Sequence, residues 1–315
     1  MNLPRDKKRQ RAFLLRLFGS AIAFGLVAFL IYQNWADFIE ALSSLPAGIL
    51  LIALLLAFVS RLMVTLRWFV LLRVVEPQVR FRQVLKLSFV GLFATNVLPS
   101  TIGGDVVKLG GAVQGGLDSA KVTASLVIDR LVGMATMATF LPVGIIQIVQ
   151  ANQAASMVGS SGPGVFFARI WQKVSKFMMD TWQSLKLWSK QPLNLVIAAA
   201  FSFFHMASTF TMVVVLLGGL KEPISWWTAG GLWVLVYFIT LVPVSINGLG
   251  LQEASLSLVY VSFAGVSESS SLVLALLMRV LFMIASLPGA LFLPSAFSGD
   301  RKSKASAQQD QLNHE

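Results

Sequence analysis

The chain of 315 residues has no cysteine and only two histidines. Without cysteine it has no disulfide framework, no thiolate metal site and no cysteine nucleophile. His314 falls in a polar C-terminal stretch, so His205 would have to support any histidine-based metal or acid–base chemistry alone. We therefore expect neither a metal nor another cofactor, and we do not expect an enzyme.

Charged residues are scarce as well. They make up 12% of the chain, against about 25% in typical soluble domains, and 56% of the residues are hydrophobic. Uncharged runs close to the roughly 20 residues that a membrane-spanning helix needs occur at 17–36, 87–104, 131–149, 191–220 and 223–252. The longest polar interruption, at 150–192, is too short for a soluble catalytic domain. These features predict an all-α polytopic membrane protein with about eight membrane-embedded helices.

The apolar runs and their flanks set the expected helix positions. They predict helices at 14–33, 46–72, 84–98, 120–149, 193–217 and 226–246, and a last apolar region at 269–297. The short segments 106–117 and 251–265 either cross the membrane or re-enter it. The first run begins like a signal peptide but is longer than a typical signal-peptide core, so we expect an uncleaved anchor.

The net charge of +11 lies beside the predicted helices. Basic residues dominate the segments 1–16, 61–86 and 169–190, whereas the loops at 33–45, 221–222 and 268 are neutral or acidic. The positive-inside rule places the basic segments in the cytoplasm. The charge therefore predicts an inner-membrane protein with both termini cytoplasmic, and it does not indicate a nucleic-acid partner.

Composition divides the chain into three parts. Residues 1–13 are a basic cytoplasmic N-terminus, 14–297 are the helical transmembrane domain, and 298–315 are a polar tail that we expect to be disordered. Within the domain, segment 169–190 places apolar residues and tryptophans at helical spacing between lysines. This pattern predicts an amphipathic helix on the membrane surface.

Three arginines and a histidine lie within or at the ends of apolar runs. Arg67 and Arg73 are expected to extend to the cytoplasmic surface, with their stems in the apolar layer. Arg61 lies deeper, and two interpretations stay open: it extends to the surface too, or it turns inward to bind an anionic headgroup. His205 is expected to hydrogen-bond to a neighbouring helix.

Two similar motifs interrupt the apolar stretches. Residues 96–105 read Asn-Val-Leu-Pro-Ser-Thr-Ile-Gly-Gly-Asp, and residues 242–253 read Val-Pro-Val-Ser-Ile-Asn-Gly-Leu-Gly-Leu-Gln-Glu. Proline removes a backbone donor and glycine tolerates unusual φ values, so each motif is expected to break a helix at membrane depth. Such backbone persists only when it is buried in protein or lines a wet cavity. The expected hinge residues are Pro99, Gly103, Gly104, Pro243, Asn247, Gly248 and Gly250.

Each motif ends in an acid that is followed by an arginine. Arg130 comes 25 positions after Asp105, and Arg279 comes 26 positions after Glu253. In the predicted topology the first motif ends an outward helix and the second ends an inward one. The sequence therefore predicts an inverted repeat around a central site, as in many transporters.

The charged residues of the two motifs have two interpretations. They are structural ion pairs, with Arg130 bound to Asp105 or Asp129 and Arg279 bound to Glu253. Alternatively, the arginines bind a phosphate through two hydrogen bonds each, and the acids gate the site or carry a proton. The candidate transport residues are Arg130, Arg279, Asp105, Glu253, Asp129, Asn96 and Arg61.

In combination these motifs match a known family. Arg67-Trp68, the segment 96–105, the run Asp129-Arg130-Leu-x-Gly133 and the segment 243–253 together resemble the flippase-like transmembrane domain of lysylphosphatidylglycerol synthases. The resemblance covers about 14–296 and implies an inner-membrane protein, linked in some members to moving a lipid between leaflets. The chain lacks the synthases' soluble aminoacyl-transfer domain, so we do not expect it to make the lipid. It also has Asn247 where glycine is common.

Three hypotheses for function follow. The first is a flippase that works without ATP hydrolysis, because the chain has no phosphate-binding loop motif. It would move a phosphate-containing lipid: a phospholipid, an aminoacyl-phospholipid or a polyprenyl-phosphate-linked lipid. The second is a non-transporting scaffold whose partners are enzymes of envelope-lipid metabolism. The third is an intramembrane enzyme acting on a lipid phosphate. In each case the expected partners are membrane lipids with an anionic headgroup.

Overall fold

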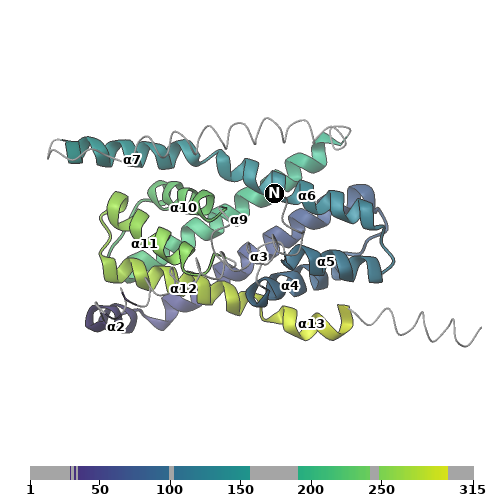
Figure 1. Ribbon diagram of the computed structural model, residues 1–315, viewed down its shortest axis with the longest axis horizontal. Coiled ribbons are helices and arrows are strands. Elements are labelled where there is room, and N and C mark those ends of the chain that lie inside the picture. The colour runs from purple at the N-terminus through teal and green to yellow at the C-terminus, as the bar shows by residue number, and fades with distance from the viewer. Residues whose placement is uncertain are drawn as a thin grey trace, which may run out of the picture.

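The computed structural model describes residues 29, 32, 35–98, 103–156, 191–241 and 248–296. In these ranges the regular structure is helical (Figure 1). The helices are α2 (Trp35–Ser43), α3 (Ala47–Val75), α4 (Phe81–Val97), α5 (Gly103–Gln114), α6 (Ser119–Ala138), α7 (Leu141–Ser156), α9 (Pro192–Gly219), α10 (Trp226–Thr240), α11 (Leu251–Ala264), α12 (Glu268–Ser286) and α13 (Pro288–Ala296). The predictions for 1–13, 169–190 and 298–315 lie outside the described residues, as do Pro99, Pro243 and Asn247.

Several helices are long and apolar enough to cross a membrane. Within the described ranges the candidate spans are Ala47–Val75, Pro192–Gly219, and two that each run through two consecutive helices, Ser119–Gln150 and Glu268–Phe292; Trp226–Thr240 is a shorter apolar helix. The prediction of an all-helical, multi-pass membrane protein is therefore confirmed.

Two predicted helices are divided. The segment 120–149 was expected to be one helix, but a turn at Thr139 and Phe140 separates α6 from α7. The apolar region 269–297 likewise turns at Leu287, between α12 and α13. Pro142 and Pro288 lie in the first turns of α7 and α13, where proline is tolerated because its missing N–H would have no helical partner. The loop expected at 33–45 also contains the short helix α2.

The two longest helices, α3 and α9, pack side by side in opposite directions (Figure 1). Gly219 at the end of α9 lies against Ile49 at the start of α3. In the middle, the Oγ of Ser60 is 2.7 Å from the Nδ1 of His205, which confirms the predicted role of His205 as an interhelical hydrogen-bonder.

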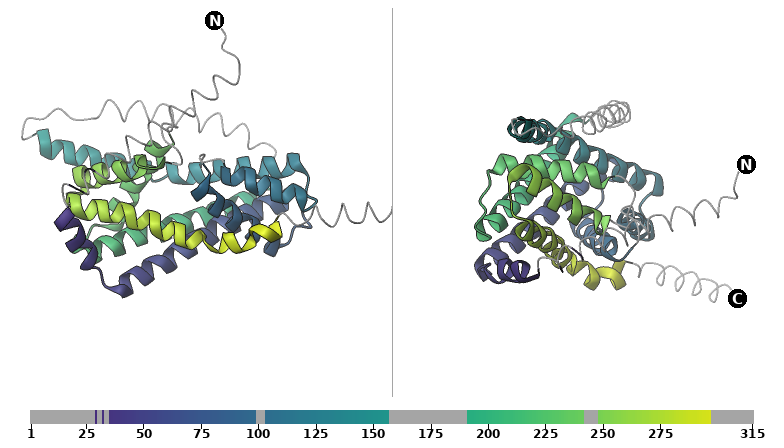
Figure 2. Two further views of the ribbon diagram at one scale, coloured as in Figure 1. Left: turned by 60° about the horizontal axis from the view of Figure 1, so that its bottom comes forward. Right: turned by 60° about the vertical axis from the view of Figure 1, so that its left-hand side comes forward.

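Each long helix is followed by a similar series of helices. The series α4 to α7 follows α3, and the series α10 to α13 follows α9. Figure 2 shows α12 and α13 following one another along one side of the molecule. The last helix of each series packs on the first helix of the other, so that α13 lies on α4 and α7 lies on α10. The two series therefore interlock.

Both interlocking contacts depend on glycine. A Cβ added to Gly144 of α7 would lie 2.5 Å from the carbonyl oxygen of Gly231 in α10. A Cβ added to Gly289 of α13 would overlap the carbonyl oxygen of Phe89 in α4. Small residues permit this close backbone approach, which is a main source of helix association in lipid.

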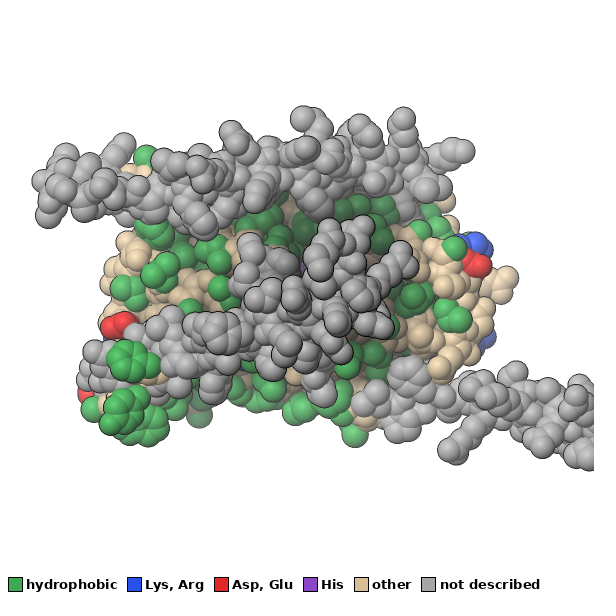
Figure 3. Space-filling view, in the orientation of Figure 1, with side chains coloured by type: hydrophobic (Ala, Val, Ile, Leu, Met, Phe, Trp, Pro, Cys, Tyr) green, Lys and Arg blue, Asp and Glu red, His purple; other side chains and the backbone are tan. Residues whose placement is uncertain are grey.

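Charge separates along the long axis of the molecule. At one end the side chain of Glu222 accepts hydrogen bonds from the backbone and hydroxyl of Ser267, so the loops after α9 and α11 meet there. The exposed acids Glu40 and Glu268 belong to helices that begin or end at this side. At the other end the Nζ of Lys121 lies 3.3 Å from Glu76. In Figure 3 the basic side chains in view lie at this second end, with an acidic side chain beside them, and many of the described side chains in view between the two ends are apolar.

Candidate functional site

The first broken motif places Asp105 at the start of α5. Asp105 is the third residue of that helix, where the helix dipole favours a negative charge. Its Oδ2 accepts a hydrogen bond from the Nε of Arg130 in α6, and its Oδ1 lies 3.5 Å from the Nζ of Lys108. The side chain of Arg130 is 42% exposed. It therefore lies at the edge of the bundle, within reach of groups that approach from the membrane.

The second motif repeats this arrangement. Glu253 is the third residue of α11, and its Oε1 accepts a hydrogen bond from the Nε of Arg279. Arg279 also donates from Nη2 to the carbonyl of Gly248 at 3.2 Å. Gly248 and Gly250 have φ values of +69° and +73°, a region that strongly favours glycine. The predicted pair of Glu253 with Arg279 is confirmed, and this arginine also holds the irregular backbone in place.

The two acid–arginine pairs occupy matching positions in the two series of helices. Each acid is the third residue of its helix, counted from Gly103 in α5 and from Leu251 in α11. Each arginine is the twelfth residue of the next helix, counted from Ser119 in α6 and from Glu268 in α12. The two motifs therefore correspond both in sequence and in the ion pair that each one forms.

A third ion pair joins Arg67 to Asp129. The Nε and Nη2 of Arg67 lie 2.7 Å and 3.0 Å from the two carboxylate oxygens, and the Nη1 donates to the Oγ of Ser202 at 3.1 Å. Arg67 is buried, so the prediction that it reaches the cytoplasmic surface is wrong. A buried carboxylate such as that of Asp129 is strongly destabilising without a cation beside it. The position of Arg67 within an apolar run was the sequence feature that could have indicated this pair. The open choice between Asp105 and Asp129 as partner of Arg130 is thereby decided for Asp105.

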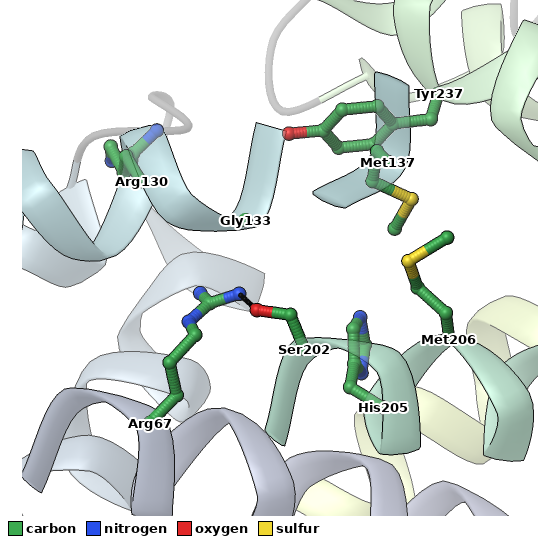
Figure 4. Close-up of a pocket in the computed structure, with 8 residues that line it drawn as sticks. All are labelled: Arg67, Arg130, Gly133, Met137, Ser202, His205, Met206 and Tyr237. Atoms are coloured by element: carbon green, nitrogen blue, oxygen red, sulfur yellow. Dashed lines mark hydrogen bonds between the residues drawn. The ribbon is translucent and has the colours of Figure 1, made fainter. Parts of the chain in front are cut away.

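Polar groups from four helices surround a central cavity of about 150 Å³. Figure 4 shows the side chains of Arg67, Ser202, His205 and Tyr237 arranged around this space, with Arg130 at its edge. The remaining lining residues are Gly133, Met137 and Met206. Gly133 is needed here because a Cβ would lie 2.6 Å from the Nη1 of Arg67. Sequence patterns did not single out Ser202, Tyr237 or Met206, since each is an ordinary residue of an apolar helix.

A second hollow of about 290 Å³ runs between α5 and α6. Its walls are mainly aliphatic, with Val106, Leu109, Leu126 and Val127 among its lining residues. Val106 and Val127 are exposed, so this groove opens to the outside of the bundle. Asp105 and Arg130 also line it. Arg130 therefore borders both the groove and the central cavity.

The other candidate residues lie outside both spaces. Asn96 donates from Nδ2 to the Oγ of Ser286 at 2.6 Å and so ties α4 to α12. The guanidinium of Arg61 lies 4.2 Å from the ring centroid of Phe282, and its buried Nε has no hydrogen-bond partner among the described atoms. Arg61 therefore turns inward but does not line either space. In the described part of the chain, no group of three histidine or carboxylate side chains is close enough to hold a metal ion.

The fold and site define a class of protein: a multi-pass helical membrane protein with ion pairs at its broken helices and a polar cavity between its two series of helices. The chain belongs to the family described as the lysylphosphatidylglycerol synthase TM region, whose model matches residues 16–289. This confirms the resemblance that the motifs indicated, over nearly the same residues. No curated protein matched the chain.

Proposed function

We propose that this protein is a flippase-like translocase that moves a phosphate-containing lipid between the leaflets of the inner membrane, without a catalytic step. The observation that supports it best is the position of Arg130, which borders both an outward-facing apolar groove and a polar cavity inside the bundle. A lipid with an apolar tail and an anionic phosphate has the two parts that these spaces would receive. Membership of a membrane-domain family named for a lipid synthase agrees with this substrate class.

The proposal treats the helices α3 to α7 and α9 to α13 as an inverted repeat. Three observations support it: α3 and α9 are antiparallel, the acid–arginine pairs stand at matching helix positions, and the last helix of each series covers the first helix of the other. The number of membrane-embedded helices, including the one predicted at 14–33, stays a prediction of about eight. Inverted repeats let one half move against the other around a central site.

The proposed transport step is an exchange of partners at the arginines. A lipid phosphate offers the guanidinium the same two-point hydrogen bonding as a carboxylate. It would displace Asp105 from Arg130 on one side of the membrane and Glu253 from Arg279 on the other. The released acid would then act as the gate. Gly103, Gly104, Gly248 and Gly250 adjoin the broken helices that would bend in this step.

The orientation in this proposal follows from charge. The end that carries Arg80, Arg82 and Lys121 would face the cytoplasm, and the end that carries Glu222 and Glu268 would face outward. Both termini would then be cytoplasmic.

The test is lipid movement in proteoliposomes. Fluorescent phospholipids and polyprenyl-phosphate lipids would be followed between leaflets for the wild type, Arg130→Ala and Arg279→Ala. Each substitution should reduce movement at least about tenfold, the effect of losing roughly 1.4 kcal/mol of binding. Arg82→Ala, which removes an exposed arginine distant from the cavity, is the matched control. Movement at the wild-type rate by both site variants would exclude this mechanism.

The second candidate function is a non-transporting scaffold for envelope-lipid enzymes. The buried pair of Arg67 with Asp129 favours it, because this pair joins helices whether or not any lipid moves. Under this hypothesis, substitution of the paired residues would lower the amount of folded protein and leave no separate transport defect. Absence of movement with every lipid tested, from wild-type protein shown to be folded, would favour the scaffold.

A further inference from the structure

The carboxylates of the two motif ion pairs differ in the contact of their second oxygen. Arg130 binds the Oδ2 of Asp105, and the Oδ1 lies 3.5 Å from the Nζ of Lys108. Arg279 binds the Oε1 of Glu253, but the buried Oε2 has no hydrogen-bond partner among the described atoms. Asp105 therefore has two cations beside it, whereas the described part of the chain gives Glu253 one.

Lys108 is held beside Asp105 by contacts of its own. It lies one turn after Asp105 in α5, it is buried, and its Nζ lies 5.1 Å from the ring centroid of Trp68, within range of a cation–π interaction. Its stem packs on α4, where a Cβ added to Gly91 would lie 2.7 Å from its Cγ. None of these contacts involves Arg130. Lys108 therefore stays beside Asp105 when Arg130 moves to a phosphate.

The second motif has no lysine in the corresponding place. The residue three positions after Glu253 is Leu256, which is fully buried in the hydrophobic core. Glu253 is itself buried, with 4% of its side chain exposed. When Arg279 leaves for a phosphate, this carboxylate loses its cation, which is strongly destabilising in a buried setting. The helix dipole at the start of α11 favours the anion, but by less than the lost partner costs.

The surroundings of Glu253 offer few other charged groups. The main described neighbours of α11 are α7, α10 and α12. Helix α7 has no titratable residue, and α10 has only Tyr237. Helix α12 has Glu268 besides Arg279, but Glu268 opens the helix, about three turns from the arginine. The segment 242–247 contains no titratable residue either. A proton from water is therefore the simplest way to neutralise Glu253.

We propose that Glu253 is a proton-binding site, which takes one proton from water when a phosphate takes Arg279 and returns it to water when the ion pair re-forms. The proton binds Oε2, and the phosphate replaces the negative charge beside Arg279. The site is neutral before and after the exchange, so the lipid anion and the proton enter and leave together. The first motif needs no proton, because Lys108 still neutralises Asp105.

This assignment deepens the proposed translocase by making it a symporter of a lipid anion and a proton. It rests on that function for the movement of lipid. The protonation of Glu253 is measurable without any movement, because removal of Arg279 has the same effect on the acid as its departure to a phosphate.

The test is infrared spectroscopy of the purified full chain, because the carbonyl stretch of a neutral carboxylic acid is distinct from the bands of a carboxylate. Arg279→Met should produce one additional neutral acid, and the added substitution Glu253→Gln should remove it. Arg130→Met is the matched control and should produce none, since Lys108 remains. Arg130→Met combined with Lys108→Met should produce one, from Asp105. Arg279→Gln repeats the comparison if Arg279→Met does not fold by size-exclusion chromatography and circular dichroism.

Lipid movement gives a second test that uses the unaltered chain. In proteoliposomes with fluorescent phosphatidylglycerol, acidifying the compartment that the lipid leaves should speed movement several-fold over the opposite gradient. In Glu253→Gln, the remaining movement should be the same under both gradients.

The outcomes separate this assignment from the proposed function. An ionised Glu253 in a folded Arg279 variant would overturn the proton site and would mean that another cation, such as Arg61, reaches it. A neutral acid in Arg130→Met alone would overturn the role of Lys108. Wild-type movement at equal rates under both gradients would overturn the symport and leave the translocase standing. A neutral Glu253 in Arg279→Met, without any lipid movement by folded wild type, would confirm the proton site and refute the translocase.

Discussion

Arg67 and Asp129 form a buried ion pair with two parallel hydrogen bonds, of 2.7 Å and 3.0 Å, between α3 and α6. The third guanidinium nitrogen donates to Ser202 in α9. One arginine thus connects three helices at the wall of the central cavity. A bidentate pair of this kind is satisfied as a unit, so removal of one partner leaves the other charge alone in an apolar setting.

Substitution of one member of this pair should be far more harmful than substitution of both. Arg67→Met is expected to cost about 3–5 kcal/mol, because Asp129 would remain buried without a cation. The double variant Arg67→Met and Asp129→Leu should recover most of that loss. Thermal unfolding in detergent measures both. A single variant as stable as the wild type would show that Asp129 finds another partner or water.

The contact of α7 with α10 should not accept a methyl group. Gly144→Ala would place a Cβ 2.5 Å from the carbonyl oxygen of Gly231, and overpacking of this kind costs about 1–3 kcal/mol. Gly218→Ala is the control, because a Cβ there meets nothing within 4 Å. Its melting temperature should equal or slightly exceed that of the wild type, since alanine favours helix. Equal melting temperatures for both variants would mean that α7 and α10 separate easily.

The absence of cysteine makes the orientation directly testable. Ser44→Cys lies at the acidic end and Gln78→Cys lies at the basic end, and both positions are exposed. A membrane-impermeant maleimide should label Ser44→Cys in intact cells and should label Gln78→Cys only after the membrane is opened. The reverse pattern would invert the topology, and labelling of both in intact cells would contradict a separation of the two ends by the bilayer.

The shape of Arg279 should matter as well as its charge. Arg279 donates to Glu253 and to the carbonyl of Gly248 from two different nitrogens, which a lysine cannot do from one compact ammonium group. Arg279→Lys is therefore expected to lower lipid movement in proteoliposomes at least about tenfold. Arg82→Lys is the matched control on the surface. Full activity of Arg279→Lys would mean that a positive charge alone is sufficient.

Local signals in the sequence predicted much of the fold and part of the site. Apolar runs located the long helices, because a bilayer sets a minimum length for an uncharged span. Proline, glycine and a following acid marked the starts of α5 and α11, where Asp105 and Glu253 are found. The pairing of Glu253 with Arg279 also followed from the motif, since Arg279 is the only basic residue between Lys221 and Arg301.

The ion pair of Arg67 with Asp129 was not predicted from the sequence, because it depends on the directions of side chains and on contacts between distant parts of the chain. Asp129 and Arg130 are neighbours, but consecutive side chains on a helix point about 100° apart. One therefore faces Arg67 and the other faces Asp105. Arg67 looked like a surface residue because its partner lies 62 positions away. The division between α12 and α13, by contrast, was signalled locally by Pro288, which opens the second helix.

The interlocking of the two series constrains how the chain is assembled during synthesis. Helix α4 is made early, yet the helix that covers it is α13, the last one described. Its backbone contact with Gly289 therefore cannot form until nearly the whole chain has left the ribosome and entered the membrane. The face of α4 that receives α13 must until then be covered by lipid or by the insertion machinery, so the bundle is completed by the last helix to arrive.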